Sequence, residues 1–418
     1  MANMIAATGG SQAPVGSVGI IGGDGRMGAV FAKVFAEFVP EVQCTKTCWT
    51  SSNSSSSDGK ITKRVDEHQQ ALENRRVLES AELVIFAVPL SATVKTIERL
   101  APFVREDQIL LDLTSLKVQP CNAMAQTKAQ TVIGGHPMFG PSTALRDQNF
   151  VLCPVRIDGN EETTGTNSKS FACQDDHPLS VSLVDQSKSS SSCTEKEPRG
   201  SSPRAKRQKL ESAKPMQSVA QTRSDHDAAA GRTGKAPTTQ KPRGDDRGAR
   251  ALDWLKNVVF KDCRLLQTTP ERHDKITAVT QSLVHLTSLC FVDTLQKADI
   301  SLAEMYQFAT PVFRAQMLSV GRNCGMQPEL FAGLQNENPE YGQVLAVFRQ
   351  SVLELSGAGE KHRGGQVVTA SPRVIEEKLQ CALKFLGPGR DGLSSLLSQV
   401  TPLLATASTT VVAHETRQ

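Results

Sequence analysis

The sequence predicts an α/β fold with a doubly wound parallel sheet, followed by an all-helical domain, with a long disordered insert between the two. Early in the chain, apolar runs alternate with helical patterns, as in sheets whose parallel strands are joined by helices. A later stretch rich in Ser, Lys, Arg, Gln, Gly and Pro lacks apolar periodicity and cannot bury enough surface to fold alone. The predicted boundaries are a flexible N-terminus at 1–16, the sheet domain at 17–159, the insert at 160–249, the helical domain at 250–405 and a flexible tail at 406–418.

The first apolar run leads directly into a glycine-rich turn. Gly23, Gly25 and Gly28 have the G-x-G-x-x-G spacing, between a strand over 17–21 and a helix predicted from about Met27 to Phe38. This context is typical of a Rossmann-type dinucleotide site, in which the pyrophosphate lies on the free N–H groups of the helix N-terminus. A glycine-rich turn without a ligand is the alternative. The predicted cofactor-binding residues of this loop are Gly22, Gly23, Asp24, Gly25, Arg26, Met27 and Gly28.

The end of the second predicted strand, over 41–47, favours NADP over NAD. NAD enzymes usually place a carboxylate there to hold the ribose hydroxyls. Here the position falls near Lys46, and Thr45, Thr47 and Ser51 are also able to bind a 2′-phosphate. Val88 and Pro89, which end the next apolar run, are placed beside the same cofactor.

Three apolar runs, ending at Pro89, Ser115 and His136, are expected to direct their carboxyl ends into one crevice. An imidazole at the end of the last run is suited to accept a proton from a substrate hydroxyl near neutral pH. Ser115 and Lys117 are close enough to this crevice to touch a substrate. The alternative roles are a structural histidine for His136, a turn-capping hydroxyl for Ser115 and a solvated charge for Lys117.

The later half of the chain reads as helices. Thr269 as N-cap and Pro270 as first residue open a helix running to about Lys297. Asp274, Gln281 and His285 lie on it at spacings of seven and four, along one stripe that faces either a substrate or a polar seam between helices. A second helix is predicted over 312–323. Apolar side chains such as Leu289 and Leu318 exceed what one small bundle buries, which predicts a homodimer joined through these helices.

Several motifs together resemble the prephenate dehydrogenase family, most closely its enterobacterial-type members. The motifs are Gly22–Gly28, Ala87–Pro89, Asp112–Lys117, Gly135–Pro141, Thr269–Lys275, Gln281–His285 and the segment 311–322. The resemblance covers about residues 17–158 and 251–345. It implies oxidative decarboxylation of prephenate to 4-hydroxyphenylpyruvate in tyrosine biosynthesis, with arogenate as the alternative substrate.

The resemblance also implies roles for individual residues. His136 accepts the proton of the substrate's C4 hydroxyl, and Ser115 shares that hydrogen bond. Arg322 first and Arg314 second are the expected carboxylate ligands, because a guanidinium binds a carboxylate with two hydrogen bonds. Phe331, together with Gln281 and His285, completes the expected substrate site. Two positions depart from the family pattern: Ser142 and Lys46 stand where many relatives carry acidic residues.

Composition limits the other possibilities. The formal net charge is +4, and the insert alone carries a basic surplus of about this size, so the folded parts are near neutral. We therefore expect no nucleic-acid partner. Ten cysteines without a CxxC pair indicate reduced thiols and no metal site. No secretory or transit signal and no apolar run of membrane-spanning length are recognised, which predicts a cytoplasmic protein. The rival readings are an NADP-dependent β-hydroxyacid or imine reductase using Lys275, and an NADP-sensing scaffold.

Overall fold

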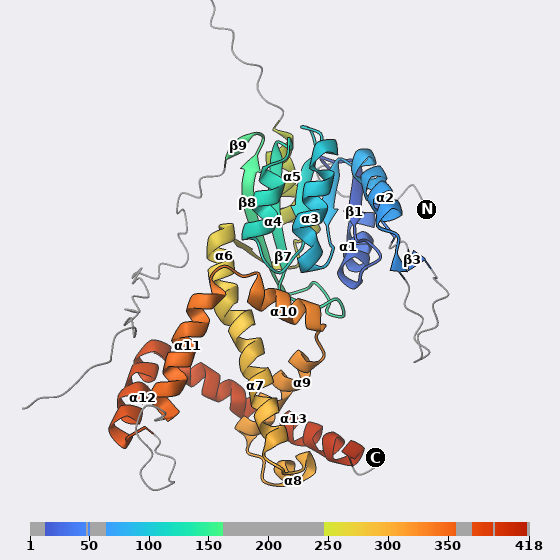
Figure 1. The fold of residues 1–418 in the computed structure, drawn as a ribbon. Coiled ribbons are helices and arrows are strands. Elements are labelled where there is room, and N and C mark those ends of the chain that lie inside the picture. The colour runs from blue at the N-terminus through green and yellow to red at the C-terminus, as the bar shows by residue number, and fades with distance from the viewer. Residues whose placement is uncertain are drawn as a thin grey trace, which may run out of the picture. The chain divides into compact units, whose positions relative to one another are not determined.

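The computed structural model describes residues 13–46, 49–50, 64–161, 246–356, 370–387 and 389–415. Figure 1 shows a sheet flanked by helices, followed by a run of helices. The sheet contains the strands β1 (Ser17–Ile21), β2 (Glu41–Cys44), β5 (Leu83–Phe86), β6 (Ile109–Asp112), β7 (Thr131–Pro137), β8 (Asn149–Ile157), β9 (Asn160–Glu161) and β10 (Arg264–Gln267). A separate two-stranded ribbon consists of β3 (Trp49–Thr50) and β4 (Arg64–Val65).

The strand order of the main sheet is β10–β8–β7–β6–β5–β1–β2, with β9 paired to β8. The neighbours from β2 to β7 are parallel, whereas β7 and β8 are antiparallel. Because β1 lies between β2 and β5, the chain reverses its direction of travel across the sheet at β1, and open sheets bind ligands at the carboxyl ends beside such a point. The predicted doubly wound, mostly parallel sheet is confirmed.

Helices cover both faces of this sheet. They are α1 (Arg26–Ala36), α2 (Glu67–Ser80), α3 (Leu90–Leu100), the short 3₁₀ turn Ala101–Phe103, α4 (Val118–Ala125) and α5 (Arg247–Trp254), which continues into a π turn, Leu255–Val259. Alternate strand residues face opposite cores. Ile85 and Leu111 pack with α1 and α5, whereas Val84 and Leu110 pack with α2, α3 and α4.

The sheet domain extends beyond its predicted end at residue 159. Trp254 and Phe260 are buried with Phe31 and Phe35 of α1, and β10 adds a parallel strand beside β8. The predicted start of the helical domain at residue 250 is therefore wrong, because residues 247–267 complete one face and one edge of the sheet. The sequence prediction placed most of these residues with the helices that follow.

The predicted insert begins and ends at neighbouring points of the sheet domain. The carboxylate of Asp158 accepts hydrogen bonds from the N–H groups of Gly248 (2.6 Å) and Ala249 (3.0 Å) at the start of α5. Of the predicted insert, residues 162–245 lie outside the described residues. The hydrogen bonds of Asp158 thus hold the start and the end of the predicted insert next to each other.

Replacing residues 162–245 with a short Gly-Ser linker is expected to preserve the fold. The ends already meet, and shortening a loop lowers its closure cost by about 0.6 kcal/mol for each halving of its length. Thermal unfolding of the two proteins measures this, and the deletion is expected to unfold at the same temperature or a slightly higher one. A large drop in the unfolding temperature would show that the insert packs against the rest of the chain.

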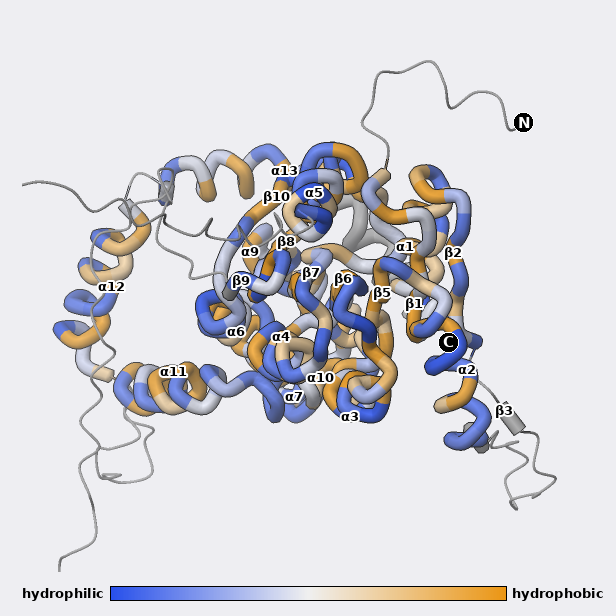
Figure 2. The backbone as a smooth tube through the Cα atoms, turned by 90° about the horizontal axis from the view of Figure 1, so that it is seen from above, coloured by the Kyte–Doolittle hydropathy of each residue, from blue (hydrophilic) through white to orange (hydrophobic). Residues whose placement is uncertain are grey.

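The remaining helices begin with one long helix made of α6 (Pro270–Thr277), a π turn (Ala278–Leu283) and α7 (Val284–Lys297). The Thr269 side chain caps it by accepting from the N–H of Arg272 (3.1 Å), as predicted. After it come α8 (Leu302–Gln307), α9 (Pro311–Cys324), α10 (Pro328–Asn336), α11 (Tyr341–Ser356), α12 (Pro372–Leu386) and α13 (Gly389–Glu415). Figure 2 shows apolar and polar residues alternating along α11 and α12. The predicted flexible tail from residue 406 is helical up to Glu415.

The helix Pro270–Lys297 is long and apolar enough to cross a membrane, judged by length and composition alone. The expectation that no apolar run reaches that length is therefore wrong for this helix. Its first turns carry the buried polar side chains of His273 and Asp274, which contact the sheet domain. A helix that packs within a protein core or an interface meets the same criterion. In Pro270–Lys297, only 22% of the apolar window is buried within the chain.

Candidate active site

The glycine-rich loop after β1 is shaped by four glycines. Gly22 adopts φ +84°, so the left-handed residue lies one position before the G-x-G-x-x-G spacing rather than at Gly23. A Cβ at Gly28 would lie 2.2 Å from the Gly22 carbonyl oxygen, and one at Gly25 would lie 3.0 Å from it. Helix α1 begins with Gly25 as N-cap and has no side-chain cap. Its first N–H groups therefore suit a phosphate, and the loop fits the predicted dinucleotide.

The loop meets the end of β5 at the point where the sheet reverses. A Cβ on Gly22 would lie 2.7 Å from the Ala87 carbonyl oxygen and 3.0 Å from the Val88 side chain. Val88 thus adjoins the loop, as a shared cofactor site requires, and Pro89 follows it as the N-cap residue of α3. Of the remaining predicted loop residues, Asp24 and Arg26 are exposed, whereas Met27 packs partly against the sheet.

Thr45 does not have the predicted role. Strand β2 ends at Cys44, and the Thr45 side chain is buried, where its hydroxyl accepts a hydrogen bond from the Gly22 N–H (2.7 Å). Thr45 therefore fixes the glycine loop instead of reaching a 2′-phosphate. Lys46 is exposed at the end of this strand, whereas Thr47 and Ser51 lie outside the described residues.

His136 lies at the carboxyl end of β7 and is 4% exposed. Its Nδ1 is 2.8 Å from Nε2 of His273, and Nδ1 of His273 is 2.7 Å from Oδ1 of Asp274. A carboxylate only accepts hydrogen bonds, so a neutral His273 donates from Nδ1 and accepts at Nε2. Nδ1 of His136 then donates to His273, which leaves Nε2 of His136 as the ring atom with a free lone pair. This chain of three side chains sets His136 as a proton acceptor.

Asp274 also joins α6 to the sheet domain. Its two oxygens accept hydrogen bonds from the N–H groups of Lys117 (2.8 Å) and Val118 (2.9 Å) at the start of α4. The carboxylate thereby caps a helix from another part of the chain and sits at its positive end. Asn338 donates to the Asp274 carbonyl (3.0 Å) and holds this turn of α6 from the other side.

The electrostatics keep both imidazoles neutral. Burial, then the His273 ring and the Lys117 ammonium, hold the pKa of His136 well below its usual range. Burial also lowers the pKa of His273, although its hydrogen bond to Asp274 opposes that shift. A neutral His136 is the form that accepts a proton.

The predicted substrate residues on the helices gather beside the loop that follows His136. Nε2 of Gln281 lies 3.8 Å from the Met138 sulfur, and the His285 and Phe331 rings stack with centroids 6.1 Å apart. Nη2 of Arg322 lies 3.3 Å from the position of a Cβ on Gly140. The same guanidinium, after burial, lowers the pKa of His285. Two residues of the loop, Met138 and Gly140, thus meet Gln281 and Arg322.

Arg314 and Ser115 are less closely tied to this group. Burial raises the pKa of Tyr306, and the Arg314 guanidinium opposes that shift, so Arg314 lies near α8. Its buried Nε has no hydrogen-bond partner among the described residues. Ser115 is half-buried on the loop between β6 and α4, two residues before Lys117. Lys117 itself is fully buried, so neither a substrate contact nor a solvated charge describes it.

Sequence reasoning missed His273, although the segment Thr269–Lys275 was singled out. The signal was a His-Asp pair in the first turns of a capped helix, where two polar groups on a buried face require partners. It also missed Asp112, whose carboxylate pairs with Lys117 inside the sheet domain. The pairing of the two histidines is not visible locally, because 137 residues separate them. Asp112 and Lys117 are only five residues apart, but the loop that brings their side chains together is not read from the pattern of apolar residues.

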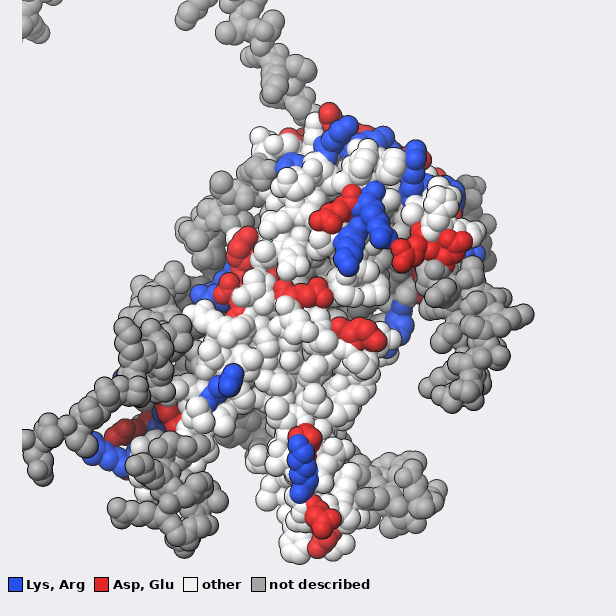
Figure 3. All heavy atoms as spheres, in the orientation of Figure 1, with Lys and Arg blue, Asp and Glu red and all other residues white. Residues whose placement is uncertain are grey.

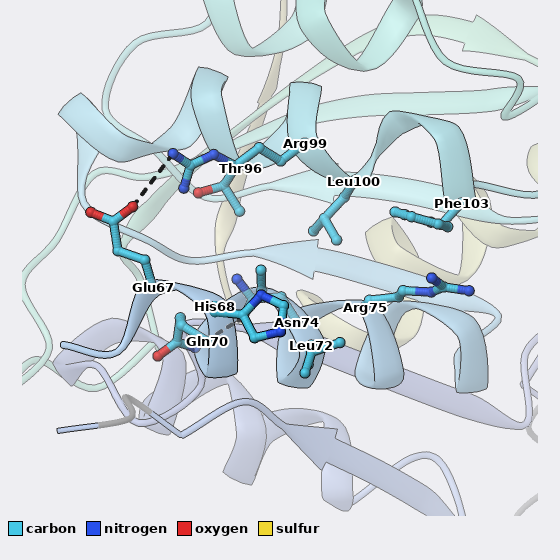
Figure 4. A pocket seen from close by; sticks show the side chains of 11 residues that line it. Glu67, His68, Gln70, Leu72, Asn74, Arg75, Thr96, Arg99, Leu100 and Phe103 are labelled. Carbon is cyan, nitrogen blue, oxygen red and sulfur yellow. Dashed lines mark hydrogen bonds and ion pairs between the residues drawn. The ribbon is translucent and has the colours of Figure 1, made fainter. Parts of the chain in front are cut away.

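A separate pocket of about 400 Å³ lies between α2 and α3 (Figure 4). Leu72, Leu100 and Phe103 form its apolar part, and the Arg99–Glu67 ion pair crosses one end. None of the predicted site residues line this pocket. Among the residues described here, no group of three or more His, Cys, Asp and Glu side chains is placed to hold a metal ion.

Two family models match the chain, one in each part. "Prephenate dehydrogenase, nucleotide-binding domain" matches residues 45–166, and "Prephenate dehydrogenase, dimerization domain" matches residues 269–368. The chain belongs to the prephenate dehydrogenase family. The first match contains His136, and the second contains His273, Arg322 and Phe331. The two matched parts are therefore joined by the hydrogen bond between His136 and His273 and by the contact of Arg322 with the loop after His136.

Relatives of known name agree with this family. The T-protein of Haemophilus influenzae is 32% identical over 337 residues, covering 80% of this chain and 60% of that protein. A "probable arogenate/prephenate dehydrogenase" of Methanocaldococcus jannaschii is 23% identical over 286 residues, covering 68% of this chain and 45% of that protein. The chain spans about half the length of these curated relatives. The crystal structure of prephenate dehydrogenase from A. aeolicus with hydroxyphenyl propionate and NAD+ gives a TM-score of 0.49 at 15% identity, covering 90% of this chain and 98% of that one.

Proposed function

We propose that the protein is an NADP-dependent prephenate dehydrogenase that converts prephenate to 4-hydroxyphenylpyruvate and carbon dioxide. The observation that carries this proposal is the Asp274–His273–His136 chain, which leaves Nε2 of a buried, neutral imidazole as proton acceptor at the carboxyl end of a strand. Arogenate, which differs in bearing a side-chain amino group, is the alternative substrate.

The chain's own residues account for the proton and the carboxylates. His136 takes the proton of the C4 hydroxyl as that carbon becomes a carbonyl carbon, and Ser115 shares the hydrogen bond to the hydroxyl. Arg322 binds the ring carboxylate, which leaves as carbon dioxide, and Arg314 is the second candidate for a carboxylate. His285, Gln281 and Phe331 line the substrate site. The loop Gly22–Gly28 would hold the nicotinamide cofactor, which would supply the acceptor for the hydride of C4.

Absorbance at 340 nm tests the activity directly. Purified protein is mixed with prephenate or arogenate, each with NADP or NAD, and the reduced cofactor is followed. The proposal expects the fastest reduction with prephenate and NADP. No reduction in any of the four mixtures, with a sample shown to bind NADP, would contradict the proposed activity and favour a cofactor-binding scaffold.

Prephenate is preferred because, within the described part of the chain, no acidic partner for the arogenate amine is evident beside His136. Ser142, which stands where many relatives carry an acidic residue, is exposed and uncharged. A site that pairs an amine with a carboxylate gains a charge-assisted hydrogen bond that Ser142 does not supply.

Replacing Lys46 with glutamate is expected to reverse the cofactor preference. Lys46 is exposed directly after β2, where a 2′-phosphate would lie, and a carboxylate there repels the phosphate and favours ribose hydroxyls. We expect the ratio of kcat/KM for NADP to that for NAD to fall by about 10-fold or more, as loss of one charged contact implies. Lys95→Glu, on the exposed side of α3, is the matched control. An unchanged ratio in Lys46→Glu would remove the basis for NADP.

We further propose a homodimer formed through the helices. Val312, Leu318, Val284 and Leu289 on α7 and α9 are 63%, 54%, 41% and 46% exposed in the single chain. Figure 3 shows the face over these helices largely free of charged side chains, unlike the sheet domain. Exposed apolar side chains gathered on two neighbouring helices are typical of an interface. Sedimentation equilibrium is expected to give twice the 45.1 kDa chain mass, and a monomer at micromolar concentration would contradict the proposal.

A further inference from the structure

A fully buried ion pair lies directly behind His136. Lys117 and Asp112 are both 0% exposed. The Lys117 ammonium donates to Oδ2 of Asp112 and to the carbonyl oxygen of Gly135 (2.7 Å), the residue before His136. Thr114 donates its hydroxyl (2.5 Å) and its N–H (3.1 Å) to the same carboxylate oxygen. The pair is thus held from the loop between β6 and α4 and reaches the strand that carries His136.

The local geometry explains why a lysine is used at this place. Strand β6 ends at Asp112, which is in register with Gly134, so Gly135 lies one residue beyond the paired part of β6. The ammonium supplies a donor to its carbonyl there. A Cβ on Gly134 would lie 3.0 Å from Cδ of Lys117 and 2.6 Å from Sγ of Cys121. The glycine leaves the space through which the lysine stem passes.

We propose that the Asp112–Lys117 pair is a positioning device for His136, which fixes the peptide before it and biases its ring toward the neutral form. Neither residue touches the reacting atoms in this scheme. The consequence for turnover rests on the proposed function, whereas the effect on the ring does not.

The charges around His136 come from two directions. His273 faces it from α6, backed by the Asp274 carboxylate, and Lys117 acts on it from the β6–α4 loop, backed by the Asp112 carboxylate. A nearby cation disfavours the imidazolium, and in a buried site water screens it little. Loss of the ammonium must therefore favour protonation of His136, and loss of the opposing carboxylate must disfavour it. The two members of the pair have opposite effects.

That difference in sign gives the test. His136 is titrated by NMR in protein labelled with [¹³Cε1]histidine, without substrate, and its signal is assigned with His136→Asn. We expect Lys117→Met to raise the pKa of His136 by about one unit and Asp112→Asn to lower it. Lys95→Met removes the same charge from an exposed site on α3 and is expected to leave it unchanged.

Should Lys117→Met not fold, Asp112→Asn combined with Lys117→Met leaves no unpaired buried charge. It is still expected to raise the pKa of His136, and to lower kcat because Gly135 loses its donor. Shifts of the same sign in both single variants, or no shift beyond that of Lys95→Met, would overturn the proposal. Because the titration needs no turnover, it can succeed when the 340 nm assay is silent, so failure of the proposed function and failure of this inference are separable.

Discussion

His136→Asn is expected to lower kcat by about 10²- to 10⁴-fold with little change in KM, the usual contribution of a general base. Asparagine has a similar size and can still donate toward His273, but it has no basic atom at the position of Nε2. The loss should thus fall on the chemical step and not on binding. Steady-state kinetics with prephenate and NADP measure both parameters.

The pH profile supplies a second readout for the same variant. His136 acts only when neutral, and its pKa is held well below its usual range. In the unmodified protein, kcat/KM should be constant around neutral pH and fall only at acid pH, well below about 6.5, the ordinary pKa of histidine. This acid limb should disappear in His136→Asn. His68→Asn, an exposed histidine on α2, is the matched control and should keep both rate and profile. Near-normal turnover in His136→Asn would end its assignment as the base.

Arg322→Gln is expected to raise KM for prephenate by about 10- to 100-fold, with a smaller effect on kcat. The Arg322 guanidinium is exposed beside Gly140 and close enough to His285 to lower its pKa, so it can meet a carboxylate at the same loop as His136. A hydrogen bond to a charged group contributes about 1.5–3 kcal/mol, which sets the expected range. Initial rates over a range of prephenate concentrations measure the change.

Arg373→Gln on α12 removes an equal charge far along the chain and serves as the control for Arg322→Gln. It should leave KM unchanged. Comparable losses of kcat and KM in Arg322→Gln and His136→Asn would mean that the two residues do not divide binding and proton transfer between them. An Arg322→Gln protein with normal KM would transfer the carboxylate role to Arg314.

Local pattern was sufficient for the elements of the fold. The apolar runs at β1, β5, β6 and β7, the glycine spacing and the capped helix at Thr269 each depend on residues close in sequence. The same holds for His136, since the end of a parallel strand is recognisable from the run before it. Residues 247–267 show the limit of this reasoning, because a helical pattern does not tell which core the helix packs on.

The sequence by itself determined the sheet, the dinucleotide loop and the candidate base. Only the tertiary structure decided that Thr45 serves the glycine loop, that Lys117 is buried with Asp112, and that His273 and Asp274 orient His136 from 137 residues away. The physical reason is that a buried polar group must find a partner wherever the fold brings one. Periodicity encodes which face is buried, but it does not encode which distant side chain completes the hydrogen bond.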